Sequence, residues 1–203
     1  MITYFLIFLN ALLYLIPSLI DGTLDPNYGS RSNPNYNKLM DWGGVRHSSL
    51  ENGEFYRLIS SMFLHFGIIH FLMNMYSLYN MGPIVEDIFG NMRMLILYIL
   101  AGISGGVATY FLGPLLGENQ GVLSAGASGA IFGLIGALIA YVYLHPNYFQ
   151  PGVMQQLIGV AAINIIFGFM ANANAASTGT LIGNSAHIGG LVAGLVIAFV
   201  IGR

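Results

Sequence analysis

The chain has 203 residues, of which 56% are hydrophobic and 7% are charged, against roughly a quarter charged in ordinary soluble domains. Such a composition cannot cover a water-facing surface, which excludes a soluble globular domain. The net charge of -2 indicates neither nucleic acid nor another anionic partner, and the lack of cysteine excludes disulfides and thiolate chemistry. The sequence therefore predicts one integral membrane domain.

Two segments open the chain. The apolar run from Ile2 to Ile20 lacks the basic start and the small-residue cleavage site of a secretory signal, so we predict a retained span. The stretch from Asp21 to about Gly67 is polar and holds four of the six basic and five of the eight acidic residues. It is too long for a simple connection and too apolar near its end for a floppy linker. We expect part of it to lie in the membrane interface as a structural or gating element.

Five further apolar runs bring the number of predicted helices to six, which account for nearly the whole chain. They cover Ile68 to Ile84, Met92 to Leu112, Ala127 to Leu144, Val153 to Met170 and Ala186 to Ile201. The second, fourth and sixth helices then run in the same direction. Because His70, Ser128 and His187 each lie near the start of one of these three helices, we expect them at a similar depth on one side of the membrane.

Ser128 lies in a Gly-Ala-Ser-Gly motif where the fourth helix begins, and His187 lies where the sixth begins. A serine and a histidine in such places indicate a nucleophile and its base. The motif alone is weak in a chain with 27 glycines, and helix packing is the alternative. Small residues at Gly129, Gly190 and Gly194 predict close contact of these two helices. Both interpretations hold together, because that contact would bring Ser128 and His187 within hydrogen-bonding distance.

The other polar residues near these helix starts have alternative roles as well. His187 fits a general base, or a structural histidine bonded to a backbone carbonyl. His70 and Asn74 share a helix face, and they fit either a polar pair bridging helices or donors to an oxyanion. In the second case the Ser128 backbone N–H at the helix start completes the oxyanion hole.

No acidic residue is well placed in the sequence to orient His187. Glu86 follows the second helix at the opposite membrane face, and Glu118 lies in the loop before the fourth helix. This inventory favours a Ser-His dyad in which packing positions the imidazole ring. Phe132, one turn after Ser128, has the spacing to stack on that ring, although ordinary core packing is the alternative.

With these motifs the chain resembles the rhomboid intramembrane serine proteases of the compact six-span bacterial type. The matching motifs are His70-x-x-x-Asn74 preceded by His65, Gly126-x-Ser128-Gly129, and Ala186-His187-x-x-Gly190-x-x-x-Gly194. The resemblance implies an all-α polytopic membrane protein with six transmembrane helices and a long, partly embedded first loop, forming a single domain over residues 1–203.

The resemblance also implies a function. Ser128 would be the nucleophile, His187 the general base, and His70, Asn74 and the Ser128 amide the oxyanion hole. The expected substrate is a single-pass transmembrane protein, cut near a small residue where its helix unwinds readily. Membrane lipid is the other expected partner, and neither a cofactor nor a metal is expected.

Two positions depart from the family pattern. The Trp-Arg pair of the first loop is Tyr56-Arg57 here, which leaves the arginine available for lipid headgroups or loop carbonyls. The aromatic residue after the serine, often tyrosine in related proteases, is Phe132, which can stack but has no hydroxyl. Neither change removes a group that the proposed chemistry needs.

Two arguments about orientation disagree. Counting basic residues would place the first loop in the cytoplasm, because it carries four of the six. The resemblance implies the reverse, namely a multi-pass protein of the bacterial inner membrane whose active site opens to the extracytoplasmic side. We adopt the second orientation, because the first loop is long and contains balancing acids.

Two other classes of protein remain open. A catalytically silent rhomboid-like protein that binds membrane clients would need neither Ser128 nor His187. A small transporter or channel would use the intramembrane histidine and asparagine along a pathway, but the chain shows no convincing internal repeat. The sequence predicts no particular oligomeric state.

Overall fold

The computed structural model describes residues 1–22, 38–118, 123–173 and 182–202, and this part of the chain is helical apart from turns and one isolated bridge between Val45 and Ser124. The long helices are α1 (Ile2–Ile20), α5 (Ile68–Phe89), α6 (Asn91–Leu112), α7 (Ser128–Leu144), α8 (Val153–Ala173) and α10 (Asn184–Ile201). The short helices are α2 (Lys38–Asp41), α3 (His47–Glu51) and α4 (Arg57–Ser60), with 3-10 turns at Ser61–Phe63, Pro114–Leu116 and Pro146–Tyr148.

The long helices follow the six predicted apolar runs. The helix α1 has the predicted bounds, whereas α5 ends five residues later than predicted. It continues through Pro83 and stops at Gly90, whose φ of 81° ends the helix and whose N–H donates to the Glu86 carbonyl at 2.8 Å. The predicted end of this helix at Ile84 was therefore wrong.

Four of the described helices are long and apolar enough to cross a membrane, namely α1, α6, α8 and α10. A fifth candidate is the pair formed by Arg57–Phe63 and α5, which is bent by 93°. The helix α7 has 17 residues, about 25 Å at 1.5 Å per residue, which is shorter than a hydrocarbon core of ~30 Å. The described residues are thus those of an all-helical polytopic membrane protein, and the count of six spans stays a prediction.

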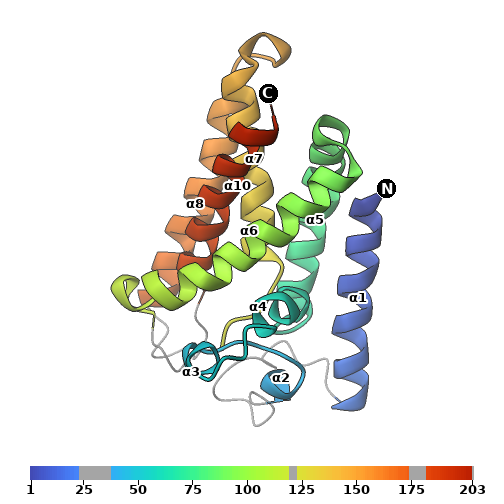
Figure 1. Cartoon of the computed structure of the whole chain (residues 1–203), viewed down its shortest axis with the longest axis vertical. Helices are drawn as coiled ribbons and strands as arrows, with labels where there is room; N and C mark the ends of the chain where they lie inside the picture. Colours follow the sequence, from blue (N-terminus) through green and yellow to red (C-terminus); the bar gives the residue numbers. More distant parts are fainter. Residues whose placement is uncertain (23–37, 119–122, 174–181, 203) are drawn as a thin grey trace.

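The helix α7 is the centre of the bundle. It packs against α10, α6, α5 and α8, and most of its side chains are buried. The helix α1 packs against α5 at the edge (Figure 1). The helices α5, α7 and α10 all begin at the end of the molecule where α2, α3 and α4 lie (Figure 1). The fold therefore brings the starts of the second, fourth and sixth predicted helices to one end.

The start of α1 is held at the opposite end by Glu86, a buried carboxylate on α5. It accepts hydrogen bonds from the backbone N–H groups of Ile2 at 2.5 Å and Thr3 at 3.0 Å, and from the Thr3 hydroxyl at 2.7 Å. The first N–H groups of a helix have no intrahelical acceptor, and the helix dipole favours an anion there. The charge of Glu86 therefore fastens the edge helix to the bundle.

Replacement of Glu86 by alanine should reduce stability by about 2 kcal/mol, because it leaves helix-start donors without their acceptor. Thermal unfolding in detergent micelles would measure the loss. An unchanged unfolding temperature would show that this contact contributes little to holding α1.

Candidate active site

Ser128 and His187 meet although they are far apart in sequence. Ser128 is the first residue of α7 and is half-buried, while His187 lies in the first turn of α10 and is buried. The Ser128 Oγ and the His187 Nε2 are 3.0 Å apart, a hydrogen-bonding distance. A hydroxyl and an imidazole at this separation have the geometry for proton transfer between them.

Glycine residues allow this approach of α7 and α10. A Cβ atom on Gly190 would collide with the Gly129 carbonyl, and one on Gly194 would collide with the Gly133 carbonyl. The two helix backbones are therefore in direct contact over more than one turn, as small residues permit in membrane proteins. The contact begins beside the first turns of both helices, so the packing also sets the distance from Ser128 to His187.

The ring of His187 is held by packing. It is parallel to the ring of Phe132 within 6°, with the ring centroids 4.2 Å apart. The Nδ1 atom is buried and has no hydrogen-bond partner among the described residues. In that part of the chain no carboxylate bonds to this ring, so the geometry is that of a pair without a third, acidic member.

His70 and Asn74 line the same cavity as Ser128 and His187, which has a volume of about 430 Å³. The His70 Nδ1 accepts a hydrogen bond from the Phe66 N–H at 3.3 Å, so in the neutral ring the proton is on Nε2. The Asn74 amide donates to the His70 carbonyl at 2.8 Å. Neither side chain bonds to Ser128, and both are donors beside the same space.

Gly126 lets the backbone pack closely against the ring of His70. Its φ is 126°, which disfavours other residues, and a Cβ atom there would lie 2.7 Å from the His70 Cε1. Its N–H donates to the Ser61 carbonyl at 2.9 Å. The first glycine of the Gly-Ala-Ser-Gly motif is therefore required by both conformation and space, two residues before Ser128.

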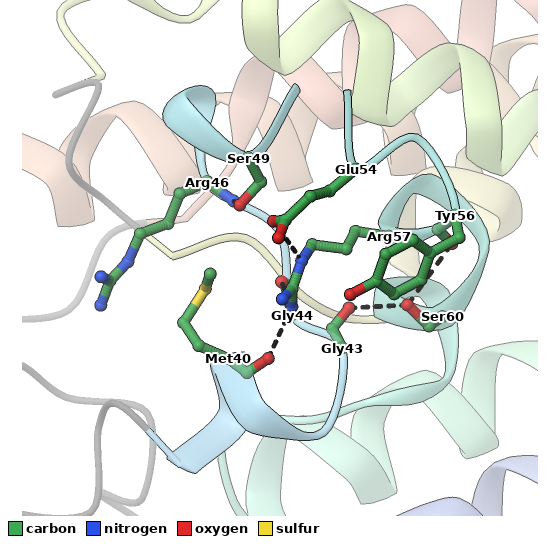
Figure 2. A network of polar contacts seen from close by, with 9 residues as sticks. All are labelled: Met40, Gly43, Gly44, Arg46, Ser49, Glu54, Tyr56, Arg57 and Ser60. Atoms are coloured by element: carbon green, nitrogen blue, oxygen red, sulfur yellow. Dashed lines mark hydrogen bonds and ion pairs between the residues drawn. The ribbon is translucent and has the colours of Figure 1, made fainter. Parts of the chain in front are cut away.

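Arg57 organises the first loop, as Figure 2 shows. Its guanidinium donates to the carbonyls of Met40 at 2.5 Å and Gly44 at 2.9 Å, and to the Glu54 carboxylate at 2.7 Å. Tyr56 is exposed, and its ring lies 5.2 Å from the guanidinium carbon. Of the two partners predicted for Arg57, lipid headgroups and loop carbonyls, the structure places it on the carbonyls.

This loop is joined to the segment before Ser128. Val45 follows the Gly44 carbonyl held by Arg57, and it exchanges backbone hydrogen bonds with Ser124 at 3.1 and 2.8 Å. Ser124 lies four residues before Ser128. Through Gly44 and Val45, Arg57 therefore helps to hold the segment that leads into α7.

Glu118 makes a contact that was not predicted from the sequence. This buried carboxylate accepts hydrogen bonds from the backbone N–H of Ser185, at 2.9 Å, and from the Ser185 hydroxyl. Ser185 lies two residues before His187. No local sequence signal gives this contact, because its two partners are 67 residues apart and the cap of α10 comes from another segment.

Comparison with known proteins shows the family of this chain. A model of the Rhomboid domain matches residues 52–203, which is most of the chain. The chain belongs to the rhomboid family. The family resemblance read from its motifs is therefore confirmed.

Three rhomboid relatives illustrate the likeness. Rhomboid protease GluP of Bacillus subtilis (strain 168) is 34% identical over 200 residues, covering 98% of this chain and 34% of that protein. The putative rhomboid protease YdcA of the same organism is 33% identical, covering 73% of this chain and 68% of that protein. RHOMBOID-like protein 5 of Arabidopsis thaliana is 33% identical, covering 83% and 51%.

The chain spans about a third of the length of GluP and about half of that of RHOMBOID-like protein 5. Membership of the rhomboid family agrees with a multi-pass membrane protein.

The glycine contact between α7 and α10 predicts a difference in stability between two glycine-to-alanine variants. Gly194→Ala should lower stability by roughly 1–3 kcal/mol, because the new methyl group overlaps the α7 backbone. Gly159→Ala on α8 is the matched control, since nothing lies within 4 Å of its Cβ position. Thermal unfolding of both variants in the same detergent measures the difference, and equal stability would contradict the close packing of α7 and α10.

Proposed function

We propose that this rhomboid is a serine endopeptidase that cleaves single-pass transmembrane proteins with a Ser-His dyad. The observation that carries the proposal is the 3.0 Å separation of the Ser128 Oγ and the His187 Nε2. The likeness to rhomboid proteases supports the same activity.

The reaction is acyl transfer in two halves. The His187 Nε2 takes the proton of the Ser128 hydroxyl as its oxygen attacks the scissile carbonyl carbon. The tetrahedral intermediate then breaks its C–N bond, and the imidazolium returns the proton to the leaving amine. Water, deprotonated by His187, attacks the acyl ester, releases the second product and restores the serine.

The negative charge on the attacked carbonyl oxygen needs donors. The Ser128 N–H lies at the start of α7, where the helix dipole favours an anion. The Nε2–H of His70 and the amide of Asn74 line the same cavity and complete the proposed oxyanion hole. The stack on Phe132 keeps the base oriented in place of a carboxylate.

The substrate and its surroundings follow from the setting. A cavity at the α5, α7 and α10 starts can take an unwound segment of a substrate helix together with the water that hydrolysis needs. We place the chain in a bacterial inner membrane as a single domain of six spans, with this end facing the extracytoplasmic side. Lipid surrounds the remaining apolar helix faces.

Replacement of Ser128 or His187 by alanine should abolish cleavage, since each removes one half of the proton-transfer pair. The measurement is cleavage of a model single-pass substrate by purified protein in liposomes. Circular dichroism and thermal unfolding of each variant check that it is folded. Cleavage at the parental rate by either folded variant would refute the dyad.

A serine-directed fluorophosphonate probe separates the protease from a client-binding protein. The protease is labelled at Ser128, and Ser128→Ala is not. A folded parent that neither cleaves nor reacts with the probe would instead favour the client-binding function.

Asn74→Ala should slow turnover by ~10²-fold without eliminating it, because one of several oxyanion donors is lost. Rates of substrate cleavage in liposomes, compared with Ser128→Ala as the zero level, measure the effect. A parental rate would remove Asn74 from the oxyanion hole, and complete loss in a folded variant would assign it a larger role.

A further inference from the structure

Two glutamates are buried in the described part of the chain, and each binds the start of a helix. Glu86 binds the start of α1, far from the dyad. Glu118 binds the start of α10, which carries His187. Neither carboxylate bonds to Ser128 or His187, but Glu118 lines the same cavity as these two residues and Glu86 does not.

The carboxylate of Glu118 binds the first turn of α10 beside this cavity. It accepts from both the N–H and the hydroxyl of Ser185, which is fully buried. That hydroxyl is also 3.4 Å from the Thr109 hydroxyl on α6. Without the carboxylate, the Ser185 N–H would be a buried donor lacking an acceptor, and the turn would rotate or unwind to satisfy it.

Glu118 is itself held in place by the end of α6. Its N–H donates to the Gly113 carbonyl at 2.8 Å, and a Cβ atom on Gly113 would lie 3.3 Å from its carboxylate. The end of α6 therefore presents this side chain to α10. The next residue of α10, Ala186, presses its carbonyl against Gly105 of α6, where a Cβ atom would lie 2.8 Å away.

We propose that Glu118 is a positioning residue, which sets the first turn of α10 and thereby the His187 ring relative to Ser128. The inference rests on the proposed protease function. Its physical basis is that a displacement of about 1 Å in a reacting group can cost up to ~10²-fold in rate. Packing against α6 and α7 limits how closely α10 approaches, and the carboxylate supplies the polar tether.

The experiment compares Glu118→Ala, Glu118→Gln and the control Glu86→Ala in liposomes. Two readouts are used, namely the rate of Ser128 labelling by a fluorophosphonate and the separate kcat and KM for a model substrate. We expect Glu118→Ala to slow labelling and kcat by roughly 10- to 100-fold, with KM changed by less than about threefold. Glu118→Gln should recover most of the rate, because its amide oxygen accepts from the Ser185 N–H and its amide N–H donates to the hydroxyl.

The Glu86→Ala control separates an effect on the position of His187 from a general loss of stability. Glu86→Ala should lose stability yet be labelled at the parental rate, since its helix start is remote from the dyad. Parental labelling and kcat in folded Glu118→Ala, or equal slowing in Glu86→Ala, would overturn the proposal. If Glu118→Ala does not fold, Glu118→Asp replaces it, because its shorter side chain cannot reach both groups of Ser185.

Failure of the proposed function is recognised separately. In that case the parent itself is neither labelled nor active. Hydrogen exchange of the α10 first-turn amides still tests the contact in that case. Faster exchange in Glu118→Ala than in Glu86→Ala supports the positioning of this turn, and equal exchange overturns it.

Discussion

The direct contact of the α7 and α10 backbones is the constraint on which the rest of the site depends. Any side chain at Gly190 or Gly194 would meet a carbonyl of α7, so no other residue permits this separation. The contact places the first turns of both helices together, which brings the Ser128 hydroxyl to the His187 ring. It also lets the Phe132 ring lie flat on that imidazole. In the proposed enzyme, the packing that stabilises the fold is the same packing that forms the dyad.

Charge is scarce in this chain, and two buried glutamates and one half-buried arginine bind backbone groups that the helices and the first loop leave unpaired. Glu86 and Glu118 each accept hydrogen bonds from the start of a helix, while Arg57 donates to two loop carbonyls. In an apolar environment such backbone groups have no water to bind, so each unsatisfied one is costly. The two glutamates join segments 83 and 67 residues apart, while Arg57 joins parts of the first loop 13 and 17 residues apart. These hydrogen bonds fix the relative positions of elements, which non-directional apolar packing alone does not do.

The sequence predicts what depends on local composition, and it fails where long-range contacts decide. The apolar run Ile2 to Ile20 and the helix α1 have the same bounds, because composition alone defines that helix. The common direction of three helices follows from counting, and Figure 1 has their starts at one end. The predicted end of α5 was wrong because the helix tolerates Pro83 in its interior and ends only at Gly90. The carbonyl partners of Arg57 and the cap by Glu118 depend on tertiary structure, so no spacing rule reveals them.

A dyad without an acid needs another source of order for its base. In soluble serine proteases a buried carboxylate fixes the imidazole through its second nitrogen. Here the Nδ1 of His187 has no partner among the described residues, and the ring is held by a stack and by the turn of α10 that carries it. A carboxylate is nevertheless close by, because Glu118 accepts from the N–H of Ser185, two residues before His187. In the proposed enzyme, Glu118 positions the start of α10, and the start of α10 positions the ring of His187. In the proposed enzyme the acid therefore acts on the position of the base.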